Sequence, residues 1–149
     1  MKIALGSDHA GLSLKNEIKL VLAELRFTVT DFGTKSDTAV DYPDFAWPVS
    51  KAVATGTHDR GILICGSGVG MAMAANKIAG VRAANVLDIK SARLSREHNN
   101  VNVLALAARV TTTPIALEIV KVFLSTSFSG GRHERRIAKI AELERRRDV

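Results

Sequence analysis

The sequence predicts an α/β fold in which a parallel β-sheet is covered by helices on both faces. Short runs rich in Ile, Val, Leu and Ala alternate along the chain with longer amphipathic segments, which is the pattern of repeated strand–helix units. With 149 residues, 46% of them hydrophobic, the chain is long enough to bury a core without disulfides or a structural metal. Because no linker, low-complexity segment or internal repeat interrupts the pattern, we expect one domain over residues 1–149.

Five short apolar runs, each followed by a turn or a polar residue, are predicted to be strands. They span residues 2–7, 28–32, 61–65, 82–87 and 102–107. Helices are expected at residues 12–25, 44–54, 69–79, 89–97, 114–125 and 132–146. Thr113 suits the N-cap of the fifth helix and Pro114 suits its first position. Residues 33–42 are expected to form a polar loop.

The net charge of +6 raises the question of a nucleic-acid partner. Much of the basic excess belongs to the expected terminal helix, 132–146, which is more typical of a solvated or subunit-contacting face. We expect the arginines at its end, Arg145, Arg146 and Arg147, to be solvated. With only five Phe, one Tyr and one Trp, the chain has no basic–aromatic platform for stacking bases, so no nucleic-acid partner is expected.

Targeting and redox features indicate a cytoplasmic protein with no membrane partner. The N-terminal stretch is broken early by Gly6, Asp8 and His9, unlike a signal peptide, and no apolar run approaches the roughly 20 residues that span a bilayer. Cys65 is the only cysteine, which excludes an intramolecular disulfide and every Cys-cluster metal site.

A glycine-rich turn follows the third predicted strand and is the strongest local signal. Gly66, Gly68 and Gly70 lead from Cys65 directly into a predicted helix, so several backbone N–H groups can point at one anion. Such surroundings favour a thiolate at Cys65 that could act as a base or nucleophile, although a small buried hydrophobe explains a lone cysteine equally well.

A dinucleotide site is a competing interpretation of this turn. Asp88 could be the acid expected about 20 residues after a Rossmann glycine motif. However, Met71 stands where the third glycine of GxGxxG belongs, and the turn is not the first in the chain. This interpretation is therefore disfavoured.

Other chemistry-bearing residues also follow predicted strands. Asp8 and His9 follow the first strand and Arg109 follows the fifth, at the same carboxyl edge as Cys65, where ligands bind in open α/β sheets. A helix cap at Asp8 and simple packing at His9 are the alternatives. Because independent strand ends converge there, we favour a site. His58, in a Gly/Thr/Asp turn, is expected at the surface.

Two further polar motifs carry candidate site residues. His98 and Asn99 precede the fifth strand, at the amino edge, so they are either structural or supplied to a neighbouring subunit's site. Arg132 and Arg136 are four residues apart and share one helical face, which suits either a phosphate clamp or a solvated basic helix.

Five segments, in this order, resemble the type B ribose-5-phosphate isomerase family, which includes galactose-6-phosphate and allose-6-phosphate isomerases. They are GSDHAG, DYPDFA, CGSGVGMAMAANK, RLSREHNNVNVLALAARV and FLSTSFSGGRHERR. The resemblance implies a three-layer α/β/α sandwich with a five-stranded parallel, Rossmann-like sheet. It also implies a homodimer, or a dimer of dimers, in which His98 and Asn99 act in the partner's site and helix 132–146 contacts the partner.

The same resemblance implies a role for each matching residue. Cys65 matches the base that moves a proton between C1 and C2 of the open-chain sugar, Ser67 a group that passes a proton between O1 and O2, and His98 the residue that opens the ring. The enediolate would be held by backbone amides of Gly66, Gly68, Val69 and Gly70. Asp8, Tyr42 and Asn99 match contacts to sugar hydroxyls, and the phosphate ligands are His9, Arg109, Arg132 and Arg136. No metal or nucleotide cofactor is implied.

Departures from the family pattern are few. Ala107 stands where relatives commonly have Gly, and the helix after Cys65 lacks the Glu that serves as base in a second branch. Galactose-6-phosphate isomerases are commonly built from two different subunits, whereas this chain carries both the Cys65 and the His98 groups. Ribose 5-phosphate is therefore the expected substrate and allose 6-phosphate the second choice. A non-catalytic sugar-phosphate or nucleotide-binding module is the alternative from another class.

Overall fold

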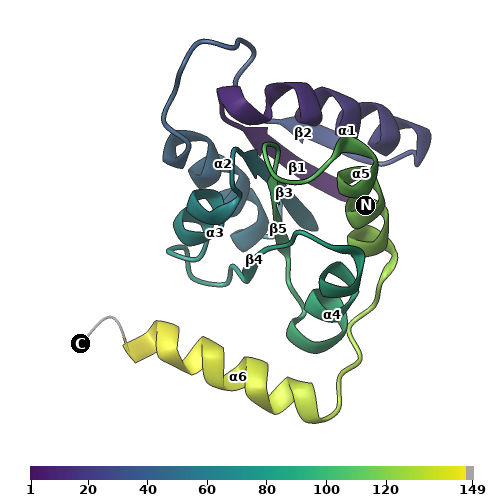
Figure 1. Cartoon of the computed structure of the whole chain (residues 1–149). Helices are drawn as coiled ribbons and strands as arrows, with labels where there is room; N and C mark the ends of the chain where they lie inside the picture. The colour runs from purple at the N-terminus through teal and green to yellow at the C-terminus, as the bar shows by residue number, and fades with distance from the viewer. Residues whose placement is uncertain (147–149) are drawn as a thin grey trace.

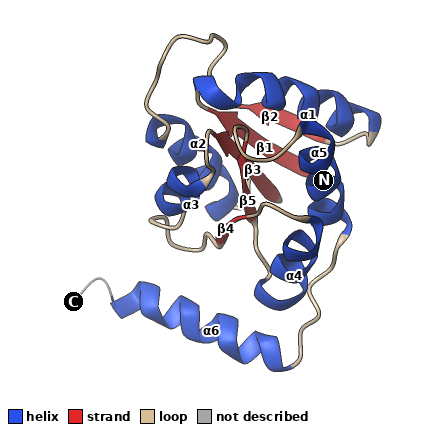
Figure 2. Ribbon diagram, viewed as in Figure 1, coloured by secondary structure: helices blue, strands red, loops and turns tan. Residues whose placement is uncertain are grey.

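A computed structural model describes residues 1–146 and contains a sheet of five parallel strands. The strands are β1 (Lys2–Ser7), β2 (Thr28–Asp31), β3 (Arg60–Cys65), β4 (Ala83–Asn85) and β5 (Val103–Ala107). They lie in the order β2-β1-β3-β5-β4, with every neighbouring pair parallel (Figure 2). The predicted parallel sheet is confirmed.

Helices cover both faces of this sheet, which confirms the predicted three-layer α/β/α sandwich (Figure 1). A short 3₁₀ turn, η1 (His9–Gly11), precedes α1 (Leu12–Glu24), which packs on one face with α4 (Ile89–Asn99) and α5 (Thr113–Ser125). The opposite face carries α2 (Pro43–Ala54) and α3 (Val69–Ala75). The last helix is α6 (Arg132–Arg145).

Alternate residues of each central strand enter different layers of the core. In β3, Ile62 and Ile64 face α1, α4 and α5, whereas Leu63 and Cys65 face α2 and α3. All four side chains are at most 5% exposed. A parallel strand buried on both faces needs an uninterrupted apolar run, which is why these strands were recognisable in the sequence. The pleat also places Cys65 on the α2 and α3 side of the sheet.

Several predicted boundaries were wrong, among them the end of α3, both ends of β4 and the start of α5. Helix α3 ends at Ala75 rather than residue 79, and β4 starts at Ala83, because the Asn76 amide bonds both backbone groups of Ala83 at 2.8 and 2.9 Å. Strand β4 also ends early, at Asn85. Helix α5 begins at Thr113, with Thr112 rather than Thr113 in the cap position. A proline lacks only an N–H group that the first helical turn leaves unpaired anyway, so Pro114 does not fix the first residue.

Helix α6 is set apart from the sheet and runs along one side of the molecule (Figure 1). Its connector bonds to α4 through the Ser129 N–H and the Glu97 carbonyl, 3.0 Å apart. Near its other end, the Glu144 carboxylate accepts the Gly80 N–H at 3.0 Å. Arg145 and Arg146 are exposed as expected, and Arg147 lies outside the described residues. Within residues 1–146, no helix combines the length and apolar character needed to cross a membrane.

A buried lysine anchors the loop between β2 and α2. Lys15, 1% exposed, donates from Nζ to Asp31 at 3.0 Å and to the Thr34 carbonyl at 2.6 Å. Lys19 bonds the other Asp31 oxygen at 2.9 Å from an exposed position. Burial raises the pKa of Asp31, but hydrogen bonds from Lys19, the Gly33 amide and Lys15 outweigh it, so the net pKa is lowered.

We predict that Asp31→Ala lowers the free energy of unfolding at pH 7 by about 3–5 kcal/mol, because it leaves the buried Lys15 ammonium without its counter-ion. Lys19→Ala removes only the exposed pair with the same carboxylate and should cost at most about 1 kcal/mol. Urea unfolding of both variants gives these values. Equal losses would contradict the account.

The pH dependence follows from the lowered pKa of Asp31. The stability that this group contributes is fully present above its unfolded pKa, about 3.9, and is lost as the pH falls through the lower folded value. The difference between the wild-type protein and Asp31→Ala should therefore shrink below about pH 4.

Candidate active site

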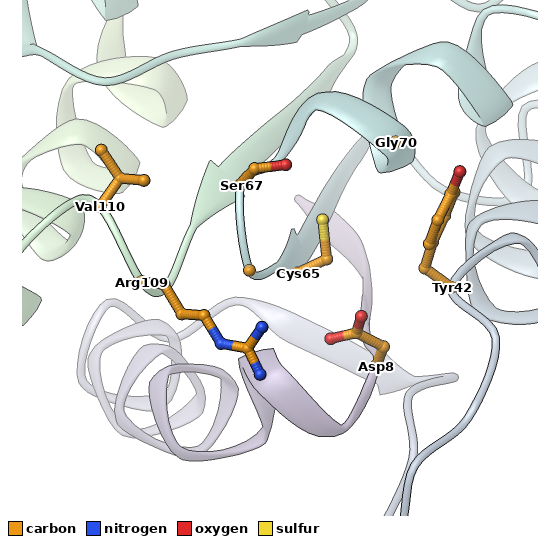
Figure 3. Close-up of a pocket in the computed structure, with 8 residues that line it drawn as sticks. Asp8, Tyr42, Cys65, Ser67, Gly70, Arg109 and Val110 are labelled. Carbon is orange, nitrogen blue, oxygen red and sulfur yellow. The ribbon is translucent and has the colours of Figure 1, made fainter.

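A cavity of about 360 Å³ opens at the carboxyl edge of the sheet, where the segments after β1, β3 and β5 meet (Figure 3). Strands β1 and β3 are neighbours there, and the chain leaves them toward opposite ends of the sheet. Such a switch point is where open α/β sheets bind ligands. The cavity is lined by Asp8, Tyr42, Cys65, Gly66, Ser67, Gly70, Arg109 and Val110.

The glycine turn holds the Cys65 side chain through a backbone amide. Gly68 has φ +76°, a left-handed conformation that L side chains rarely adopt, and its N–H donates to Cys65 Sγ at 3.2 Å. The thiol is 5% exposed but reaches the cavity. The turn therefore holds the sulfur at the cavity wall with a backbone N–H directed at it.

The segment after β5 is hydrogen-bonded to the start of the glycine turn. The Ala108 N–H donates to the Cys65 carbonyl at 2.9 Å, and the Arg109 N–H donates to the Gly66 carbonyl at 3.0 Å. The Arg109 side chain lies against Gly66, where an added Cβ would come within 3.3 Å of Nη1. These two backbone hydrogen bonds fix the start of the turn and bring the Arg109 guanidinium to the cavity wall.

Asp8 satisfies both interpretations of the sequence. Its Oδ1 accepts the Gly11 N–H at 3.1 Å and so caps η1, and the same side chain, 6% exposed, lines the cavity. His9 follows it and accepts the Val40 N–H on Nδ1 at 3.1 Å. A ring that accepts on Nδ1 carries its proton on Nε2 when neutral, so His9 presents an N–H donor on its free side.

Tyr42 lines the cavity on the same side of Cys65 as Asp8, across from Val110 (Figure 3). Its ring lies so close to Gly70 that a Cβ there would collide with it. Val110 was not predicted as a site residue, although it also lines the cavity and is 64% exposed. Its only sequence signal is its place directly after Arg109. Val69 lies in the first turn of α3 and is half exposed.

Four predicted site residues lie away from this cavity. His98 stacks on His133 of α6 with ring centroids 4.3 Å apart, and Asn99 lines a separate hollow beside Arg82 and Ile140. Arg132 and Arg136 are exposed on α6. As the sequence predicted for His98 and Asn99, these two residues are not brought to Cys65 within one chain. The two arginines, for which the sequence predicted only a shared helical face, do not reach the cavity either (Figure 1).

Burial shapes the region around His98. Desolvation lowers the pKa of His133, which is 8% exposed, and the neighbouring His98, Arg132 and Arg136 lower it further. The buried Arg96 holds the end of α4 in place by donating to the Val101 carbonyl and to Asn100 Oδ1 at 2.9 Å. Burial, followed by the charges of Arg60 and Arg82, lowers the pKa of Arg96 to about 10.

Asp88, the acid of the disfavoured dinucleotide interpretation, caps α4 and accepts the Ser91 N–H at 2.8 Å and the Ser91 hydroxyl at 2.7 Å. One sequence interpretation needs correction. His58 is half-buried rather than a free surface residue. Its Nε2 lies 2.8 Å from Thr30 Oγ1, and its ring packs edge-on against Phe32.

Known proteins share this sequence and fold over nearly the whole chain. A family model described as Ribose/Galactose Isomerase matches residues 3–140. The chain belongs to the ribose/galactose isomerase family. Ribose-5-phosphate isomerase B of Escherichia coli is 48% identical over 147 residues, which is 99% of each chain.

Solved structures of other ribose/galactose isomerases have the same architecture. Ribose-5-phosphate isomerase B of Clostridium thermocellum superposes with a TM-score of 0.97 at 50% identity, covering 98% of this chain and 99% of that one. The Mycoplasma genitalium enzyme with bound ribulose-5-phosphate gives a TM-score of 0.94 at 48% identity, covering 97% and 96%. These matches extend through the glycine turn and Cys65.

We predict that Gly68→Ala destabilises the protein more than Gly56→Ala does. Both glycines have positive φ, +76° and +72°, so either alanine adds strain of about 1–2 kcal/mol. Space is open around Gly56, whereas a Cβ at Gly68 would collide with the Asn85 side chain. Overpacking should add about 1–3 kcal/mol to the Gly68 variant alone, measured by urea unfolding. Similar losses in both variants would show that no close contact exists at Gly68.

Proposed function

We propose that this protein is an aldose–ketose isomerase that interconverts ribose 5-phosphate and ribulose 5-phosphate. The observation that carries the proposal is the placement of Cys65 Sγ, which accepts the Gly68 N–H and reaches a cavity also lined by Arg109 and Asp8. Relatives at 48–50% identity are named ribose-5-phosphate isomerase B, and their chains are matched almost end to end. The names of these relatives favour the pentose phosphate as substrate.

In this proposal Cys65 moves the proton. With ribose 5-phosphate in its open-chain form, the thiolate removes the C2 proton and returns it to C1, so that the carbonyl moves from C1 to C2. The enediolate formed between these steps carries negative charge on oxygen. Backbone N–H groups of Gly66 and Gly70, which line the cavity, are candidates to bind it. Those of Gly68 and Val69 would have to exchange their contacts with Cys65 Sγ and Ser67 Oγ for the enediolate oxygen. A preorganised donor is worth about 2.7–4 kcal/mol in acyl-transfer enzymes.

Ser67 would exchange a proton between the two substrate oxygens. Its Oγ accepts the Val69 N–H at 3.3 Å, which leaves the hydroxyl hydrogen available to a substrate oxygen. The side chain is at the cavity wall and belongs to an exposed residue. A hydroxyl that both donates and accepts suits a relay between O1 and O2.

The remaining groups of the cavity would fix the ends of the substrate. Asp8 and Tyr42 line it with a carboxylate and a phenol, both suited to bonds with sugar hydroxyls. Arg109 of the cavity wall would bind phosphate, which accepts several charge-assisted hydrogen bonds. His9 is not one of the residues that line the cavity, but it directly follows Asp8, and its Nε2–H would be a further phosphate donor.

A second copy of the chain would complete the site in a homodimer, or a dimer of dimers. His98 would open the sugar ring, with Asn99 on a hydroxyl and Arg132 and Arg136 on the phosphate, all from the partner. Helix 132–146 would make much of the subunit contact. In support, α6 exposes Ile140 by 42% and Leu143 by 56%, apolar surface that a partner could bury.

We predict that Cys65→Ala lowers kcat for ribose 5-phosphate by about 10²–10⁴-fold, the contribution typical of a general base. Binding of ribitol 5-phosphate, which has no carbonyl to isomerise, should remain within a few-fold of wild type by calorimetry. Assays with allose 6-phosphate and galactose 6-phosphate identify the preferred substrate. Near-normal turnover by Cys65→Ala would refute its role as the base.

The shared site makes a separate prediction about mixed subunits. Cys65→Ala and His98→Ala should each be inactive alone. After subunit exchange, each mixed dimer would carry one intact site, so activity should return to about a quarter of the wild-type value. Native mass spectrometry would verify the exchange. No recovery in a verified mixture would indicate that each site is built from one chain.

A further inference from the structure

Asn85, the last residue of the edge strand β4, reaches across to the glycine turn. Its Nδ2 donates to the Ser67 carbonyl at 3.1 Å. Its Oδ1 lies against Gly68, where an added Cβ would collide with it. Because the Ser67 carbonyl can only accept, the amide must be oriented with nitrogen toward Ser67.

The peptide group that Asn85 holds is the one that bonds the candidate base. The Ser67 carbonyl and the Gly68 N–H belong to a single planar peptide unit. Asn85 Nδ2 donates to the carbonyl oxygen of this unit. The N–H at the other end of the unit, that of Gly68, donates to Cys65 Sγ at 3.2 Å. Hydrogen bonds in such a chain polarise one another, so a donor on the carbonyl strengthens the N–H as a donor.

Stability alone does not account for asparagine at this position. Asparagine is disfavoured in strands. Among residues 1–146, Asn85 Oδ1 is buried and has no hydrogen-bond partner, which is an unfavourable state for a polar atom. An apolar side chain of similar size would avoid both costs. The benefit of the amide therefore lies in what its nitrogen does to the turn.

We propose that Asn85 is a positioning residue that orients and polarises the Ser67–Gly68 peptide and so favours the thiolate of Cys65. Its catalytic consequence rests on the proposed function, whereas its effect on the thiol does not. Other ionisable or charged groups that face Cys65 across the cavity are Asp8 after β1, Tyr42 before α2 and Arg109 after β5. These groups are unchanged in an Asn85 variant.

The test is the pH dependence of alkylation by iodoacetamide, which reports only Cys65 because the chain has one cysteine. Asn85→Leu keeps the size of the side chain and removes the donor. We expect the midpoint of the rate–pH curve to rise by about half to one pH unit, the equivalent of one hydrogen bond. Asn85→Asp replaces the donor with an anion. It should raise the midpoint of the rate–pH curve by at least as much as Asn85→Leu does.

Catalysis and stability provide the second readout. Asn85→Leu should lower kcat for ribose 5-phosphate roughly three- to tenfold, with KM nearly unchanged because the phosphate ligands are untouched. Its melting temperature should not fall. Asn76→Leu is the matched control. Asn76 also hydrogen-bonds backbone groups through its side-chain amide: its Nδ2 donates to the Ala83 carbonyl and its Oδ1 accepts the Ala83 N–H. Asn76→Leu should leave the alkylation curve in place.

The outcomes separate this inference from the proposed function. An unchanged alkylation curve in both Asn85 variants, or the same change in Asn76→Leu, would overturn the role of Asn85. If the wild-type protein isomerises no sugar phosphate but the curve moves as expected, only the proposed function fails. If Asn85→Leu does not fold, Asn85→Asp alone decides through its alkylation curve.

Discussion

The contact between the Gly68 N–H and Cys65 Sγ is the interaction on which the rest of the site depends. It requires a left-handed residue directly before α3, which glycine provides at φ +76°. The geometry is enforced from two directions: the Arg109 amide bonds the Gly66 carbonyl, and the Asn85 amide bonds the Ser67 carbonyl. The turn after β3 is therefore held by the segment that follows the neighbouring strand β5 and by the edge strand β4 beyond it. A local conformation thus depends on tertiary structure.

In the proposed function a second chain would complete the site for a phosphate dianion, and the charge distribution within one chain supports this. Arg109 is the one Lys or Arg that lines the cavity within residues 1–146, and the Asp8 carboxylate faces the same space. Arg132 and Arg136 lie on α6, which stands apart from the sheet (Figure 1). Supplying such groups from a partner concentrates cationic donors on the phosphate only after assembly, which would couple activity to the dimer.

Sequence patterns were sufficient for the sheet and for most of the cavity. Apolar strand runs placed Asp8, Cys65 and Arg109 at one edge because carboxyl ends of parallel strands share that edge. What they could not reveal were side chains that act over long separations. Lys15 bonds the Thr34 carbonyl 19 residues away, and Asn85 bonds Ser67 18 residues away. Neither position has a local periodicity that marks it, since each contact exists only once strands and helices have packed.

In the proposed reaction Cys65 transfers a proton, and no hydride passes directly between C1 and C2. A thiol at the wall of an open cavity exchanges its proton with water. Ribose 5-phosphate should therefore be converted in deuterium oxide and the ribulose 5-phosphate analysed by NMR for deuterium at C1. We expect deuterium at C1 of the ribulose 5-phosphate that is formed. Product formed at full rate without solvent deuterium would contradict proton transfer by Cys65.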